Sequence, residues 1–79
     1  MDTVTAFVLI NAESDTEKEV LSELKMIREI KEAYTIHGVY DILTRIEDDD
    51  AETIKDVLEI KIRKLEKVRS TLTMICIDS

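Results

Sequence analysis

Apolar residues follow two different spacings along the chain, and these spacings predict alternating strands and helices. Residues 3–11 (TVTAFVLIN) are rich in β-branched and aromatic side chains and are too few for a convincing helix, so they predict a strand. The centre of this segment, residues 6–10, is apolar at every position. Because a strand of this composition is usually covered on both faces, we expect both sides of the first strand to be packed.

A helix is predicted to follow the first strand. Residues 14–17 (SDTE) have the form of a capping box, in which the Ser14 oxygen and the Glu17 carboxylate satisfy free backbone N–H groups at the helix start. After this box, apolar residues recur at helical spacing, while charged residues occupy the opposite face. The predicted apolar stripe consists of Val20, Leu21, Leu24, Ile27 and Ile30, and the predicted solvent face of Lys18, Glu19, Glu23, Lys25 and Arg28.

Two further strands are predicted at residues 33–37 (AYTIH) and 40–47 (YDILTRIE). Only Gly38 and Val39 separate them, which is the spacing of a two-residue hairpin turn. Gly38 is the only glycine in a chain without proline. Since glycine adopts the positive φ that tight hairpin turns require, Gly38 is expected to be left-handed.

A second helix over residues 51–65 and a fourth strand over residues 68–77 (VRSTLTMICI) complete the predicted order βαββαβ. This order predicts an α+β, ferredoxin-like fold formed by residues 1–79 as a single domain. Right-handed crossovers place both helices on one face of a four-stranded antiparallel sheet. The predicted apolar stripe of the second helix consists of Ala51, Ile54, Val57, Leu58, Ile62 and Leu65.

The other face of this sheet is also predicted to be apolar, although no helix covers it. The first strand is apolar on both sides, and the last alternates Leu72, Met74 and Cys76 with Ile75 and Ile77. A bare apolar face is typical of a protein–protein contact. A domain this small also has a core worth only about 3 to 5 kcal/mol. We therefore expect a homodimer in which a two-fold copy of the same sheet covers the open face.

Charge and composition narrow the expected partners and location. A net charge of −7 repels phosphate, so direct DNA binding is not expected. The single cysteine, Cys76, requires no oxidising compartment and is expected to be a buried, inert thiol. The start of the chain lacks a signal peptide, and no stretch reaches the roughly 18 to 20 apolar residues that span a bilayer. A complete, cytoplasmic protein without membrane contact is predicted.

No residue pattern requires an enzyme or a metal centre. The acidic run Asp48–Asp50 lacks the spacing of a calcium loop, and acids are favourable at a helix N-terminus for dipole reasons alone. His37 is the only histidine, which excludes a multi-histidine metal site within one chain. Nucleotide-binding, serine-hydrolase and C-x-x-C motifs are absent. We therefore expect no catalytic residues, no metal and no cofactor.

Two groups of residues could bind a small molecule. The turn Gly38-Val39-Tyr40-Asp41 offers backbone N–H and C=O groups beside an aromatic ring and a carboxylate. Thr71 and Thr73 fall on the same face of the last predicted strand, one pleat apart. Both groups also have ordinary structural explanations, since glycine is common in hairpins and threonine in strands. Composition leaves both interpretations open.

The order of three motifs resembles the ligand-binding domain of the Lrp/AsnC family, also called the RAM domain, over nearly the whole chain. The motifs are Lys31-Glu32-Ala33-Tyr34, Gly38-Val39-Tyr40-Asp41, and Val68-x-x-Thr71-x-Thr73-Met74-Ile75 after an amphipathic helix. The resemblance implies a non-enzymatic module, linked to transcriptional regulation, that binds free amino acids between dimers and forms higher oligomers, often octamers. Family members typically carry an N-terminal helix-turn-helix. Because the first strand begins close to Met1, a stand-alone member that co-assembles with full-length regulators is expected.

By this resemblance, residues 38–41 match the Gly-x-Tyr-Asp loop of the family, and Thr71 and Thr73 match its paired threonines. The expected ligand-binding residues are therefore Gly38, Val39, Tyr40, Asp41, Thr71 and Thr73. Asp41 can hold an ammonium group, and the loop backbone and the two hydroxyls can donate to a carboxylate. Val39 occupies a position that is often polar in the family.

Two other protein classes share this order of elements. A small dimeric enzyme of the isomerase or cofactor-free oxygenase type could use His37, Tyr40 or Asp41. Such enzymes usually enclose a cavity lined by several aromatic residues or histidines, whereas this chain has three aromatic residues and one histidine. An ACT-type amino-acid-binding domain usually has a glycine in the loop after the first strand. The corresponding segment here, INAESDTE, has none.

Overall fold

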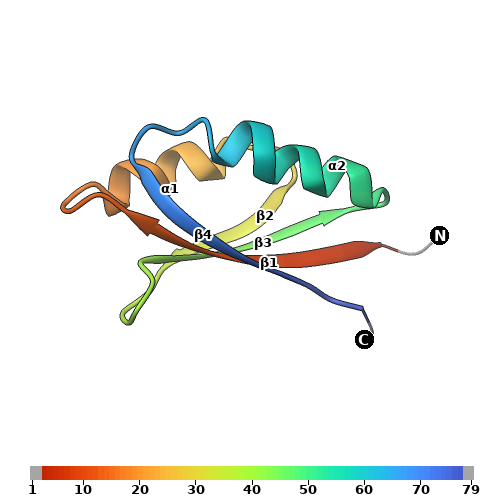
Figure 1. Cartoon of the computed structure of the whole chain (residues 1–79), viewed down its shortest axis with the longest axis horizontal. Coiled ribbons are helices and arrows are strands. Elements are labelled where there is room, and N and C mark those ends of the chain that lie inside the picture. Colours follow the sequence, from red (N-terminus) through yellow and green to blue (C-terminus); the bar gives the residue numbers. More distant parts are fainter. Residues whose placement is uncertain (1–2, 78–79) are drawn as a thin grey trace.

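The computed structural model describes residues 3–77, which form a four-stranded antiparallel sheet with both helical segments on one face (Figure 1). The sheet order is β2-β3-β1-β4, so β1 and β3 are central and β2 and β4 are the edges. The predicted α+β, ferredoxin-like fold is confirmed. In chain order the elements are β1 (Val4–Ala12), α1 (Glu17–Lys25), β2 (Ile30–Thr35), β3 (Ile42–Asp48), α2 (Ala51–Asp56), the π-helical continuation η1 (Val57–Ile62) and β4 (Val68–Ile75).

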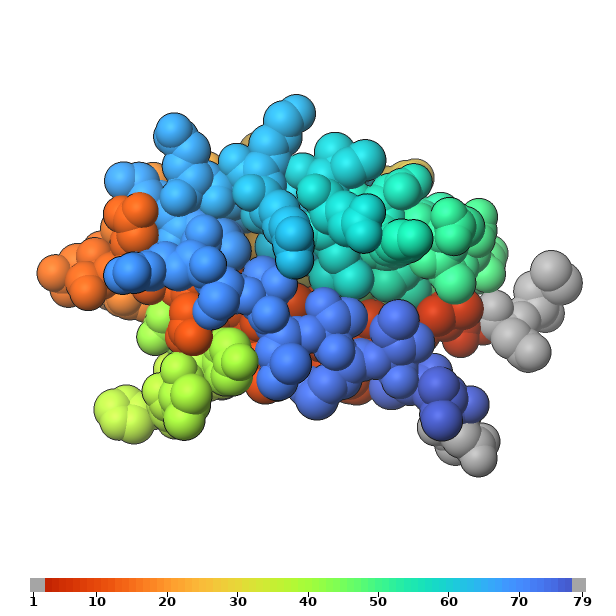
Figure 2. Space-filling model, viewed as in Figure 1, coloured from red at the N-terminus to blue at the C-terminus, as the bar shows by residue number. Residues whose placement is uncertain are grey.

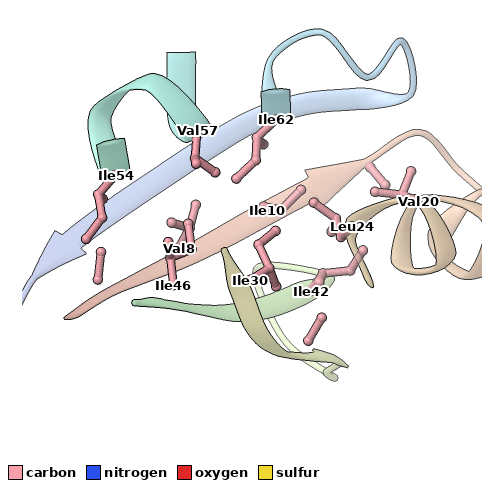
Figure 3. Packing of buried hydrophobic residues seen from close by; sticks show 13 residues of the cluster. Val8, Ile10, Val20, Leu24, Ile30, Ile42, Ile46, Ile54, Val57 and Ile62 are labelled. Atoms are coloured by element: carbon pink, nitrogen blue, oxygen red, sulfur yellow. The ribbon is translucent and has the colours of Figure 1, made fainter. Parts of the chain in front are cut away.

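The core lies between the helices and the sheet face that they cover (Figure 3). Alternate residues of β1 point into it, and the pairing places Ala6 opposite Ile46 and Ile10 opposite Ile42. Thr44 occupies a fully buried position between these pairs, and its hydroxyl donates to the carbonyl of Val8 at 3.2 Å, because a buried hydroxyl needs a partner. The other large core residues are Val20, Leu24, Ile54, Val57 and Ile62.

Helix α1 begins and ends differently from the prediction. The N-cap is Thr16, and the predicted capping box does not form. Instead the Glu17 carboxylate accepts from the N–H of Asp15, which adopts a φ of 66° that short polar residues tolerate. The helix ends at Lys25, so the prediction that Ile27 and Ile30 lie on the helix is wrong. Ile27 packs against the core from the segment after the helix. Ile30 begins β2 and reaches the same core from the strand.

The second helical segment has a change of pitch at its centre. An α-helical part, α2, continues as η1, where the N–H of Arg63 donates to the carbonyl of Leu58, five residues earlier. This wider turn keeps Val57 and Ile62, which are five residues apart, both in the core. Ile54, Val57, Leu58 and Ile62 form the stripe as predicted, whereas Ala51 is exposed at the first turn. The prediction that the helix extends to Leu65 is wrong, because η1 ends at Ile62 and Leu65 packs against the core from the segment that follows. None of the helices within residues 3–77 is long and apolar enough to cross a membrane.

The sheet face opposite the helices is apolar, as predicted. Its centre is Leu9, which pairs with Leu43 on one side and Leu72 on the other, and Phe7 pairs with Met74. Leu72 and Met74 are each 45% exposed. Arg45 also lies on this face, where Glu32 binds its Nε at 2.9 Å and Glu47 binds a second guanidinium nitrogen. We call the apolar part the open face: Phe7, Leu9, Tyr34, Leu43, Leu72 and Met74.

The prediction that Cys76 is a buried strand residue is wrong. Strand β4 ends at Ile75, and the Cys76 side chain is exposed. Its backbone N–H still donates to the carbonyl of Thr5 at 2.9 Å, so the chain continues beside β1. The thiol is exposed because β4 is an edge strand.

Candidate functional site

The connection between β2 and β3 is longer than a two-residue turn. Strand β2 ends at Thr35 and β3 begins at Ile42, so residues 36–41 join them. The loop is closed by the Ile36 N–H, which donates to the Asp41 carbonyl at 2.8 Å. Gly38 has no positive φ, and a Cβ placed on it would meet no atom within 4 Å. The predictions of a tight turn and a left-handed glycine are therefore wrong, because the longer loop needs no special conformation at this position.

Asp41 fastens this loop to the end of β1. Its carboxylate Oδ2 accepts from the N–H of Ala12 at 2.9 Å, and its own N–H donates to the carbonyl of Ile10 at 3.0 Å. The carboxylate is partly buried. Within residues 3–77, its other oxygen, Oδ1, makes no hydrogen bond. Asp41 therefore presents a carboxylate that is fixed through one oxygen while the other has no partner in the described part of the chain.

The remaining loop residues project from the fold. Val39 is 88% exposed, Gly38 is exposed and Tyr40 is partly buried. The loop thus combines a fixed carboxylate at its base with the partly buried Tyr40 beside it and an accessible backbone at its tip. This is the arrangement that a binding loop needs, because a rigid scaffold positions groups that a partner can reach.

Thr71 and Thr73 share one face of β4, as predicted, since they pair with Ile10 and Val8 on the face of β1 that packs into the core. Strand β4 is an edge strand, so both threonines lie at the margin of the core. Thr71 is partly buried and Thr73 is exposed. Neither hydroxyl has a hydrogen-bond partner among residues 3–77.

The loop and the threonines lie at the same end of the sheet but on opposite sides of β1. The Asp41 N–H binds Ile10 from the β3 side, and Thr71 pairs with Ile10 from the β4 side. Because adjacent strands are about 4.8 Å apart, the two backbones are separated by roughly 10 Å. A hollow of about 430 Å³ beside β4 is lined by Arg63, Val68, Arg69, Ser70 and Thr71, and includes none of residues 38–41. One chain therefore does not enclose all the predicted residues in one pocket.

A buried carboxylate, Glu29, has no counterpart among the residues predicted from the sequence. Its side chain is 7% exposed and its Oε1 lies 3.0 Å from Lys61 Nζ, with Arg28 3.7 Å from its other oxygen. The hydrogen bond from Lys61 lowers the pKa of the Glu29 carboxyl below its usual value of 4.5, although burial acts in the opposite direction. This ion pair joins the segment before β2 to η1. No local spacing indicates it, since the two residues are 32 positions apart.

Replacing Glu29 by glutamine is expected to lower the free energy of unfolding by about 1 to 3 kcal/mol at neutral pH, because Lys61 loses its charged partner. Since the folded-state pKa is below 4.5, the ion pair stabilises the fold above about pH 4.5, and its contribution is lost as the pH falls through the folded-state pKa. Urea unfolding at pH 7 and at about pH 3 measures this, with the exposed Glu23→Gln as the control. A Glu29→Gln loss that is equal at both pH values would contradict the ion-pair role.

The acidic run before α2 stabilises the start of that helix. Asp50 is the N-cap, and its Oδ1 accepts from the Glu52 N–H at 2.9 Å. The Asp48 carboxylate accepts from the Asp50 N–H at 3.0 Å. Within residues 3–77, no group of three or more histidine, cysteine, aspartate or glutamate side chains could hold a metal ion.

Known proteins resemble this chain over most of its length. The family model of the Lrp/AsnC ligand binding domain matches residues 5–79. An uncharacterized HTH-type transcriptional regulator of Pyrococcus furiosus is 34% identical over 74 residues, which cover 90% of this chain and 49% of that protein. The chain spans about half the length of the curated relatives that it matches.

Solved structures share its fold. The crystal structure of FFRP-DM1 matches with a TM-score of 0.90 and 38% identity, covering 94% of this chain and 99% of that one. A feast or famine regulatory protein from M. tuberculosis, complexed with L-methionine, matches with a TM-score of 0.77, covering 96% of this chain and 51% of that one. At 24% identity, this second likeness concerns the fold alone.

Proposed function

The chain belongs to the Lrp/AsnC ligand-binding domain family, and from this premise we propose that it is a non-enzymatic, oligomeric module that responds to a free amino acid in transcriptional regulation. The observation that carries the proposal is the position of the Asp41 carboxylate and its hydrogen bond to the end of β1. This carboxylate is held by the end of β1 and keeps one oxygen for a ligand, in a loop whose tip is exposed. A carboxylate of this kind suits the ammonium group that every free amino acid carries.

The carboxylate of the same amino acid needs hydrogen-bond donors. The backbone of residues 38–40 and the hydroxyls of Thr71 and Thr73 can supply them. An amino acid has its ammonium and carboxylate on one carbon, so the groups that bind them must be close together. In one chain, β1 separates Asp41 from Thr71. We therefore propose that the ligand lies between subunits, with the loop of one and β4 of another on either side of it.

The open face supplies the first contact between subunits in this proposal. Tyr34, Leu72 and Met74 of this face are exposed. Phe7, Leu9 and Leu43 are half-buried between them, on the sheet side that carries no helix (Figure 1). A second copy related by a two-fold axis would cover it with an identical surface. Such dimers would then associate into a larger oligomer, for which the family resemblance implies an octamer, and create the sites between them.

The effect on DNA is proposed to be indirect. The chain has a net charge of −7, which disfavours contact with the phosphate backbone. The curated relatives are named HTH-type transcriptional regulators and are about twice as long as the matched segment. We propose that co-assembly with such full-length regulators transmits the amino-acid signal. The family match, to a ligand-binding domain, is what supports a small-molecule effector, and the Asp41 carboxylate favours an amino acid as its class.

Thermal unfolding with each of the twenty amino acids tests the proposal. An effector at 100 times its dissociation constant is expected to stabilise the protein by about 2.7 kcal/mol. Asp41→Asn should remove this shift, because the amide is uncharged, while its oxygen can still accept from the Ala12 N–H and keep the loop closed. The matched control is Asp49→Asn, an exposed acid on another loop. If no amino acid stabilises the wild type, the sensing function is wrong.

A further inference from the structure

The segment that leads from η1 into the first two residues of β4 concentrates positive charge in an otherwise acidic chain. Residues 63–69 contain Arg63, Lys64, Lys67 and Arg69 against the single acid Glu66, whereas the whole chain has a net charge of −7. The segment is on the surface, where η1 leads into β4 (Figure 2). An isolated positive region attracts anionic ligands that the rest of the molecule repels.

This segment forms most of the hollow beside β4. The volume of about 430 Å³ is in the range of small-molecule sites. Of its lining residues, Arg63 and Arg69 make no ion pair with any of residues 3–77. Ser70 and Thr71 are consecutive in β4, so their side chains point to opposite faces; the Ser70 hydroxyl accepts from Asn11 at 3.2 Å on the open side, and the Thr71 hydroxyl is on the side of the helices without a hydrogen bond to any of residues 3–77. The lining thus offers two guanidinium groups and the Thr71 hydroxyl, and contains no acidic side chain.

We propose that this hollow is a carboxylate subsite that makes the effector a dicarboxylic amino acid, aspartate or glutamate. The inference rests on the proposed function, because Thr71 belongs both to the hollow and to the proposed amino-acid site. Guanidinium groups bind carboxylates through paired charge-assisted hydrogen bonds. Asparagine and glutamine have one acceptor oxygen and an NH₂ donor in place of two acceptor oxygens, so they would accept fewer of these hydrogen bonds and lose the charge attraction. The hollow therefore discriminates between each acid and its amide.

Isothermal titration at low ionic strength, with L-glutamate, L-aspartate, L-glutamine and L-asparagine, tests the subsite. One acid is expected to bind at least about tenfold more tightly than its amide. The double variant Arg63→Gln/Arg69→Gln should lose this preference. The control Lys18→Gln/Lys55→Gln removes the same charge from exposed positions outside the hollow and should retain it.

The titrations distinguish a failure of the subsite hypothesis from a failure of the proposed function. Equal binding of acid and amide, or an acid preference that survives in the arginine variant, overturns the subsite while leaving amino-acid sensing in place. Glutarate, which has two carboxylates but no ammonium group, serves as the additional probe. Arginine-dependent binding of glutarate without binding of any amino acid would support the subsite and refute the proposed function. If neither an amino acid nor glutarate binds, both the subsite and the proposed function are wrong.

Discussion

Replacing Leu72 by aspartate is expected to dissociate the proposed sheet-to-sheet dimer into a monomer that remains folded. Leu72 pairs with Leu9 at the centre of the open face and is 45% exposed in one chain. A carboxylate is tolerated there in the monomer, because water reaches it. In a two-fold interface, two such charges would be buried without partners, at a cost of several kcal/mol each. The dissociation constant should therefore rise by at least about a thousandfold.

Sedimentation velocity at several concentrations measures this change, and circular dichroism reports whether the variant is folded. Ile60→Asp is the matched control, because Ile60 is a 56% exposed apolar residue of η1 and lies outside the open face. This control is expected to sediment like the wild type. A Leu72→Asp protein that keeps its oligomeric mass would show that the sheets do not pair through this face.

Replacing Ile46 by alanine is expected to leave much of the protein unfolded. Ile46 is fully buried and pairs with Ala6 on one side and Ile30 on the other. Truncating a buried isoleucine costs about 2 to 5 kcal/mol. A core of this size supplies only about 3 to 5 kcal/mol. If the folded state is an oligomer, part of the loss should be recovered at high protein concentration, because association favours the folded chain.

Urea unfolding at a fixed protein concentration measures the loss. The control Ile60→Ala makes the same chemical change on the exposed surface of η1, so its effect should be within about 0.5 kcal/mol of the wild type. Similar losses at the two positions would be incompatible with a core between the helices and the sheet.

The fold was predictable because apolar residues recur every second position in the strands and every three to five positions in the helices. The buried residues of β1 and the stripe at Ile54, Val57 and Ile62 each follow the spacing of their element. Element ends were less predictable. Ile30 fits the spacing of α1 but is buried as a strand residue, since apolar spacing does not show where the chain changes direction. Gly38 suggested a tight turn, whereas the hydrogen bond between Ile36 and Asp41 closes a longer loop.

The candidate site was only partly predictable, for a similar reason. The resemblance identified Asp41 and Thr71, and the structure places them on either side of Ile10, an arrangement that depends on strand order. The Glu29–Lys61 pair and the hollow lined by Arg63 and Arg69 form only when helix and strand come together. Charged residues of this kind look like ordinary surface residues in the sequence.

The oligomeric mass in the presence and absence of a mixture of the twenty amino acids tests the central claim most directly. Light scattering or sedimentation should show at least a dimer without amino acids and a changed mass distribution with them. Asp41→Asn should retain the dimer but lose the response. A wild-type protein that is a monomer in dilute solution, or an oligomer whose mass is the same with and without amino acids, would contradict an amino-acid-responsive assembly.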